Sequence, residues 1–235
     1  MKILFLVGLC AFYISSSAQQ KTVDVSSGDV SPLAPSFFTV VGGEPVVNAK
    51  FAKLVEGSPY FKDDWLKGWV MINGGQEFAG VYLKLDLYDN QVHFKDNSGN
   101  EMIATTTVKK LTLFDSSAQE VYNFINGSFI ITNNKLTGWY QTLADGKVSL
   151  FKQYKKQLRE DRPYGSATFE QSIFTSPHYF VLVNGDFKEI KKIKDFPDVL
   201  SEKKEPLSQY IKTNNLSGKT DDDFINLINY FNGLN

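Results

Sequence analysis

Apolar and polar residues alternate through most of the stretch from Trp65 to Asp115. In the clearest run every second residue is apolar, and one face carries Val81, Leu83, Leu85 and Leu87. A period of two is typical of an antiparallel strand with one buried face and one wet face. The runs are interrupted by turn residues, and Asn73-Gly74-Gly75 supplies the positive φ angles of a tight hairpin. The pattern therefore predicts an antiparallel meander.

The alternation is looser on either side of this stretch, where shorter strands are expected. The run Phe37–Val41 is predicted to form the first strand. After residue 115, hairpins are predicted around Asn126-Gly127, Asp145-Gly146 and Asn184-Gly185, and a separate strand is predicted over Phe169–Phe174. Asn-Gly and Asp-Gly pairs favour the type I′ turns that join antiparallel strands.

The hydrophobic period changes from two to 3.6 after Asp195, which predicts short helices there. Thr220 is predicted to cap the last helix, and the three aspartates at 221–223 favour the positive end of its dipole. The apolar stripe of this helix consists of Phe224, Leu227, Ile228 and Phe231, and it must be packed for so short a helix to be stable. The predicted fold class is α+β: an antiparallel β-meander, barrel-like or a sandwich, followed by a small C-terminal helical segment.

Residues 1–18 have the features of a signal peptide. Lys2 provides the charged start, the segment from Ile3 to Ile14 is apolar, and small residues ending at Ala18 form a cleavage site. Acylation of Cys10 is the alternative, but Leu9 stands where a lipoprotein signal needs a small residue. Cleavage after Ala18 removes the only cysteine, so no disulfide is expected.

The chain is accordingly divided into a signal peptide (1–18), a flexible leader rich in Ser, Asp, Gly and Pro (19–36), an antiparallel β domain (37–190) and a helical C-terminal segment packed on the β domain (191–235). We expect an exported protein, either periplasmic or secreted. The net charge of −1 gives no indication of a nucleic-acid partner. After the signal peptide, no apolar run is long enough to span a bilayer.

The polar residues show no spacing that is typical of a metal, cofactor or catalytic site. His93 is predicted on the outward face of its strand and His178 at a strand entrance, without an HExxH pattern. The loop 96–101 resembles a calcium loop only superficially, because Glu101 stands where such a loop needs Gly and Thr107 where it needs a bidentate Glu. We therefore expect no metal, no cofactor and no enzymatic activity.

Aromatic residues are the strongest candidates for a ligand-binding site. Trp65, Trp69, Trp139 and Tyr140 lie on or beside predicted strands. Aromatic rings on a sheet surface can stack on sugars or close an apolar pocket. The more common role of such residues is to fill the core or to cap its ends.

Several segments are similar to recurring blocks of an uncharacterised family of exported proteins from Bacteroidota. They include EGSPYFKDDWLKGWV, LKLDLYDNQVHF, GWYQTLADGKVSLFKQYKK and DDDFINLINYFNGLN. The similarity extends from about Lys50 to Leu234 and includes the order of the blocks. It implies an envelope or secreted location in a Gram-negative cell. The family has no assigned activity, so it implies no catalytic residue.

These observations favour a non-enzymatic binding or assembly module of the cell envelope. Its partner would be an envelope component or a small ligand. The alternative is a hydrolase that uses dispersed carboxylates in a cleft of the β domain, because such pairs come from distant strands and leave no local motif. Two acids with shifted pKa values that converge in a pocket would favour the hydrolase.

Overall fold

The computed structural model of the chain describes residues 37–46, 51, 53–131, 136–165 and 167–234. The predicted signal peptide and leader lie outside the described residues. The elements are α1 (Phe37–Val41), β1 (Gly43–Pro45), β2 (Leu54–Glu56), β3 (Leu66–Ile72), β4 (Glu77–Asp86), β5 (Gln91–Lys95), β6 (Glu101–Ala104), β7 (Val108–Asp115), β8 (Glu120–Asn126), η1 (Gly127–Phe129), β9 (Trp139–Ala144), β10 (Ser149–Asp161), β11 (Glu170–Val183), β12 (Asp186–Ile190), η2 (Ile193–Asp195), α2 (Phe196–Val199), η3 (Ser201–Lys203), α3 (Lys204–Thr213) and α4 (Asp221–Gly233).

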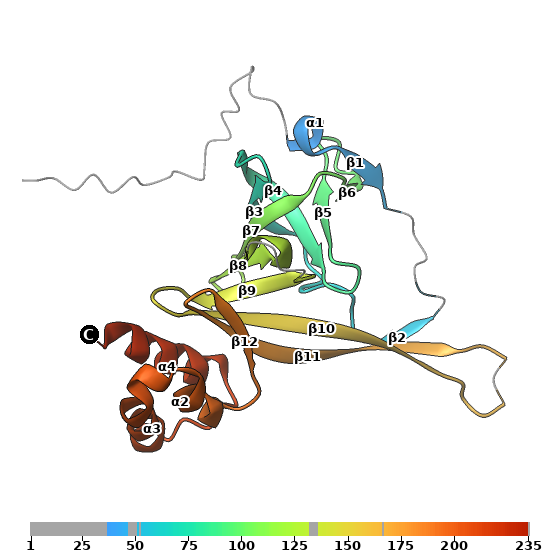
Figure 1. The fold of residues 1–235 in the computed structure, drawn as a ribbon. Coiled ribbons are helices and arrows are strands. Elements are labelled where there is room, and N and C mark those ends of the chain that lie inside the picture. The colour runs from blue at the N-terminus through green and yellow to red at the C-terminus, as the bar shows by residue number, and fades with distance from the viewer. Residues whose placement is uncertain (1–36, 47–50, 52, 132–135, 166, 235) are drawn as a thin grey trace, which may run out of the picture. The chain divides into compact units, whose positions relative to one another are not determined.

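All strands join one sheet, in the order β1-β6-β5-β4-β3-β7-β8-β9-β10-β11-β12, with β2 paired to β11 outside this path (Figure 1). Neighbouring strands are antiparallel except β2 and β11, which are parallel. The order begins with β1 and ends with β12, so the sheet is not closed. Apart from α1 and the short η1, the helices follow the last strand, and this arrangement confirms the predicted α+β class. Among the described residues, no helix combines the length and apolar character that crossing a membrane requires.

The first half of the sheet is curled, and a short connection explains why. Three residues link Ala104 at the end of β6 to Val108 at the start of β7, although β5, β4 and β3 lie between these strands. In a flat sheet four strand spacings would separate them by about 19 Å. A link of this length spans at most about 14 Å. The sheet therefore bends around a first core, whose most buried members include Val70, Leu83, Leu85, Phe94, Leu111, Leu113 and Phe124.

The predicted first strand, Phe37–Val41, is wrong: the segment forms α1. Its buried residues Phe37 and Val41 are spaced by one helical turn, and Phe37 packs edge-to-face on Phe94 at 4.8 Å. Gly42 ends the helix with φ +68°, where a Cβ would lie 2.5 Å from the Thr105 hydroxyl. A five-residue apolar run fits a buried strand or a buried helical turn equally well, so periodicity cannot separate them.

Two further boundaries differ from the predictions. Asn126-Gly127 does not join two strands, because Asn126 instead caps η1 by accepting a hydrogen bond from the Ser128 backbone N–H. The segments predicted as separate strands around Phe169–Phe174 and Tyr179–Val183 belong to the single strand β11. In contrast, the predicted turn at Asn184-Gly185 is confirmed, with φ of 51° and 84°.

The C-terminal helices pack on the sheet around a second core. The predicted stripe Phe224, Leu227, Ile228 and Phe231 is at most 2% exposed. Its sheet-side partners include Val148, Leu150 and Val181. The Thr220 hydroxyl caps α4 by accepting from the Asp223 N–H, as predicted. The second core thus joins the helices to β9, β10 and β11.

Candidate functional site

The four aromatic candidates lie in two different places. Trp139 and Tyr140, at the start of β9, line a pocket and are only 2% and 4% exposed. Trp65 and Trp69 lie beside and within β3, and neither lines that pocket. Trp69 is the most exposed of the four at 39%. The structure therefore does not bring them together as one site.

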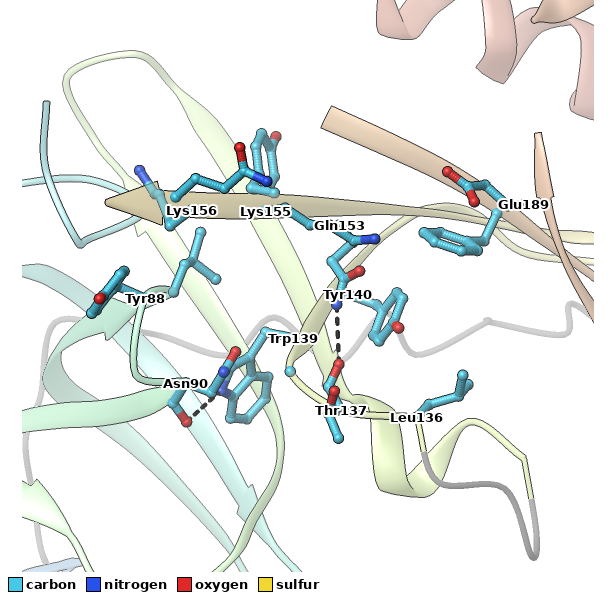
Figure 2. Close-up of a pocket in the computed structure, with 15 residues that line it drawn as sticks. Tyr88, Asn90, Leu136, Thr137, Trp139, Tyr140, Gln153, Lys155, Lys156 and Glu189 are labelled. Carbon is cyan, nitrogen blue, oxygen red and sulfur yellow. Dashed lines mark hydrogen bonds between the residues drawn. The ribbon is translucent and has the colours of Figure 1, made fainter. Parts of the chain in front are cut away.

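The pocket forms where β9 separates from β10. The two strands pair only through Leu150, Phe151 and Lys152 of β10, which continues to Asp161. Beyond Lys152, β10 faces the 136–138 segment and the turn between β4 and β5 (Figure 2). The pocket between them has a volume of about 490 Å³. It is lined by Leu87, Tyr88, Asn90, Leu136, Thr137, Gly138, Trp139, Tyr140, Gln153, Tyr154, Lys155, Lys156, Gln157, Phe180 and Glu189.

Hydrogen bonds between distant segments hold the walls of this pocket. The Trp139 indole Nε1 donates to the Asn90 carbonyl at 3.3 Å, and Gln153 Nε2 donates to the Thr137 carbonyl at 3.0 Å (Figure 2). Gly138 lies between them with φ +84°, and a Cβ there would be 2.8 Å from Asn90 Oδ1. Glycine is thus required both by the backbone conformation and by the close approach of the walls.

An aromatic cluster supports one end of the pocket. The Tyr140 ring packs edge-to-face on Phe180 and Phe187, each at 5.5 Å, and those two rings stack at 5.0 Å. Burial raises the pKa of Tyr140, although its hydrogen bond with Gln153 acts in the opposite direction. The phenol is therefore neutral at physiological pH and can both donate and accept hydrogen bonds.

Charged side chains from β10 and β12 border the same pocket. Burial lowers the pKa of Lys156, although the charges of Asp63 and Asp86 oppose this effect. A hydrogen bond with His178 lowers the pKa of Glu189 against the effect of burial. Glu189 is the one carboxylate among the described residues that line the pocket. The paired acids that a carboxylate hydrolase needs are thus not found in this lining.

Sequence analysis missed a hydrogen-bonded chain at the edge of the pocket. Ser176 Oγ lies 3.3 Å from His178 Nε2, and His178 Nδ1 lies 2.7 Å from Glu189 Oε1. Ser176 and His178 share one face of β11, and Glu189 comes from the adjacent strand β12. Lys155 is directly opposite Ser176 on β10. The Ser-x-His spacing was visible in the sequence. The position of Glu189 beside His178 was not, because it depends on the register of β11 against β12 across the Asn184-Gly185 turn.

His93 lies opposite Lys84 on the face of β5 that points away from the first core, as predicted, but it is buried there, with only 3% of its surface exposed. The Tyr60 ring covers it edge-to-face at 5.6 Å. Tyr60, in the segment before β3, therefore shields a face of β5 that the alternation of apolar and polar residues predicts to be exposed to solvent. Among the residues with described positions, no group of His, Cys, Asp and Glu is arranged to hold a metal ion.

No family model matches the chain, and neither a curated protein nor a solved structure matches it.

Proposed function

We propose that the chain is an exported binding module of the cell envelope whose pocket between β9 and β10 takes a small polar ligand. The observation that carries this proposal is the convergence of Asn90, Gln153, Lys155, Lys156 and Glu189 around one cavity. A volume of about 490 Å³ lies in the range of small-molecule sites. Amide, ammonium and carboxylate groups beside aromatic rings suit a ligand with many hydroxyl or acidic groups.

Ligand-observed NMR with a library of sugars, amino acids and small organic acids tests this proposal. Lys155→Ala and Gln153→Ala should weaken binding of any hit about tenfold, since each removes one pocket contact. Lys212→Ala and Gln209→Ala, exposed on α3, are matched controls that should leave binding unchanged. A hit that binds all four variants equally would place the ligand elsewhere and contradict the proposal.

Export is tested separately on the protein from the envelope fraction. An intact mass that begins at Gln19 is expected, because the signal peptide pattern ends at Ala18. A diacylglycerol adduct on Cys10 would contradict this cleavage.

The Ser176, His178 and Glu189 chain favours a second candidate function, ester hydrolysis. Here Ser176 Oγ would attack the ester carbonyl carbon while His178 Nε2 takes the hydroxyl proton and passes it to the leaving alcohol. Water would then release the acid by the same route, with Glu189 orienting the imidazole throughout. Lys155, which is paired with Ser176 across the two strands, would stabilise the developing oxyanion.

A fluorophosphonate probe distinguishes the two functions. Hydrolysis requires that the probe modify Ser176 and that Ser176→Ala abolish the labelling. Ser172→Ala, on the same strand face, is the matched control. No labelling of the folded protein would reject hydrolysis and leave the binding proposal intact.

A further inference from the structure

The convex face of the first half of the sheet, opposite its core, carries exposed aromatic side chains. Across β4, β3, β7 and β8, the register places Tyr82 opposite Lys67, Lys67 opposite Phe114 and Phe114 opposite Val121. Directly opposite residues of antiparallel strands project from the same face. Tyr82, Phe114 and Val121 are 45%, 37% and 55% exposed. These four side chains form a row in contact with solvent.

Trp69 extends this row along β3. Its ring lies 6.0 Å from that of Phe114 in an edge-to-face arrangement, and it is 39% exposed. A shallow hollow of about 120 Å³ lies beside it, lined in part by Met71, Glu77, Lys110 and Thr112. Large exposed aromatics gathered on one face are unusual for a surface without a partner.

Lysines are placed against the aromatic rings of this face. The Lys67 ammonium lies 5.5 Å from the centroid of the Tyr82 ring. The Trp65 ring has two such neighbours, Lys84 and Lys95, each at 5.0 Å. Cations at these distances are attracted by the ring face. We call the set Trp65, Lys67, Trp69, Tyr82, Lys84 and Phe114 the lysine–aromatic face.

Acidic residues are fewer here than lysines. On these strands the register places Glu77 opposite Met71, where it lines the hollow beside Trp69 together with Lys110, and Glu101 opposite Lys95. Asp86 follows Lys84 on the same side of β4, but it is fully buried and accepts hydrogen bonds from the backbone N–H groups of Tyr88 and Asp89. The exposed charge beside the aromatic row is therefore mainly positive.

We propose that the lysine–aromatic face binds an acidic polysaccharide, a chain of sugar units that carry carboxylates. The C–H groups of a sugar ring pack on the faces of Trp69 and Tyr82, and its carboxylates pair with the ammonium groups of the neighbouring lysines. A row of alternating rings and cations offers both contacts to successive units of a linear chain. This surface is separate from the pocket, so it extends the proposed function without depending on it.

Charge and position disfavour two other occupants. Embedding the row in a lipid bilayer would also bury the Lys67 ammonium, which lies between Tyr82 and Phe114, and burying an unpaired charge is costly. A second copy docked by the same face about a two-fold axis would bring lysines against lysines. A polyanion satisfies the lysines and the rings together.

Affinity electrophoresis and titration calorimetry with polygalacturonate test the proposal on the purified mature chain, with neutral dextran as the uncharged probe. Polygalacturonate should bind, binding should weaken as salt is raised, and dextran should bind at least tenfold more weakly. The double variant Trp69→Ala/Phe114→Ala and the double variant Lys67→Gln/Lys84→Gln should each lose at least tenfold in affinity. The second variant keeps the rings, so a loss there cannot be attributed to a disturbed sheet if its circular dichroism is unchanged.

Two matched controls complete the experiment. Tyr164→Ala and Lys212→Gln remove an exposed ring and an exposed lysine elsewhere and should leave binding unchanged. The proposal is overturned if polygalacturonate does not bind, if both double variants bind it normally, or if dextran binds equally well. It is also overturned if the face instead mediates binding to phosphatidylglycerol vesicles alone, or a dimer that Trp69→Ala/Phe114→Ala abolishes.

Discussion

The side-chain amide of Asn232 pairs with the backbone of Val148 as a neighbouring strand would. Asn232 Nδ2 donates to the Val148 carbonyl at 2.9 Å, and Asn232 Oδ1 accepts from the Val148 N–H at 2.8 Å. Val148 is fully buried at the turn between β9 and β10. The last helix thereby satisfies backbone groups that no strand reaches, which is a strong requirement inside a protein.

Asn232→Ala should lower the free energy of unfolding by about 1–3 kcal/mol, because it leaves buried backbone groups without partners. Urea denaturation of the mature chain measures the effect. Asn229→Ala, an exposed asparagine on the same helix, is the control and should change stability by less than about 0.5 kcal/mol. Equal stability of the two variants would show that the Asn232 pairing contributes nothing.

Phe224→Ala and Phe231→Ala should each cost about 3–5 kcal/mol, since both rings are buried in the second core. Phe224 also stacks on Tyr179 at 4.0 Å, which ties α4 to β11. Asn226→Ala, on the exposed face, should leave the melting temperature nearly unchanged. If Phe231→Ala melted like the unmodified protein, the helix would be docked too weakly for this stripe to stabilise the fold.

Gly68→Ala should destabilise the curled half of the sheet by at least about 1–3 kcal/mol. A Cβ at Gly68 would lie 2.3 Å from the Thr112 carbonyl oxygen and 2.7 Å from Leu83 Cδ1. Gly74→Ala is the matched control, because a Cβ there meets nothing within 4 Å. Thermal melting should separate the two variants clearly, and similar melting would mean that β3 can shift to make room.

The stability contributed by Asp223 should depend on pH. Burial opposes its ionisation, but hydrogen bonds from the Ser217 hydroxyl and the backbone of residues 217–219 lower its pKa below the ordinary 3.8. The stabilisation is therefore complete above the ordinary pKa and disappears as the pH falls through the lowered folded-state value. Asp223→Asn should cost about 0.5–1 kcal/mol at pH 7, because the site is near solvent.

That cost should shrink as the pH falls below 3.8 and through the lowered folded-state pKa, because the native aspartate then becomes protonated as well. Urea midpoints at pH 7 and pH 2.5 measure this change. Asn226→Ala, an exposed change on the same helix that involves no titratable group, is the control and should give the same difference at both pH values. If the difference in stability between Asp223→Asn and the unmodified protein were the same at both pH values, the ionised Asp223 carboxylate would not be the source of the stabilisation.

The elements with strong periodicity could be predicted from the sequence. The alternation through β4 and the residue that follows it placed Leu83, Leu85 and Leu87 in the core, where they are at most 6% exposed. The stripe of α4 was equally clear, because four apolar residues at helical spacing have one common face. The segment Phe37–Val41 was mispredicted because a run of five residues is too short for its periodicity to distinguish a helix from a strand.

The candidate site could not be predicted, because it depends on which strands are neighbours and on their register. The alternation of apolar and polar residues gives neither. Which strand lies beside β3 is decided by the short link after Ala104. As a result, β7 and β8 lie between Trp69 on β3 and Trp139 on β9. The Ser176, His178 and Glu189 chain requires the register of β11 against β12. His93 was predicted on the correct face of β5, but its burial was not predicted, because the covering residue, Tyr60, comes from an irregular segment before β3.

The link between β6 and β7 also has a consequence for how the chain reaches its native state. The strands β10 and β11 follow one another in the sequence and pair with each other. In contrast, β7 can pair with β3 only after β4, β5, β6 and the link have been formed. Closure of such a loop costs chain entropy before any contact compensates it, and non-local pairing slows folding. The pairing of β3 with β7 is therefore expected to limit the refolding rate. Substitutions that weaken the contacts between β3 and β7 should slow refolding. Substitutions that weaken the contacts between β10 and β11 should mainly accelerate unfolding.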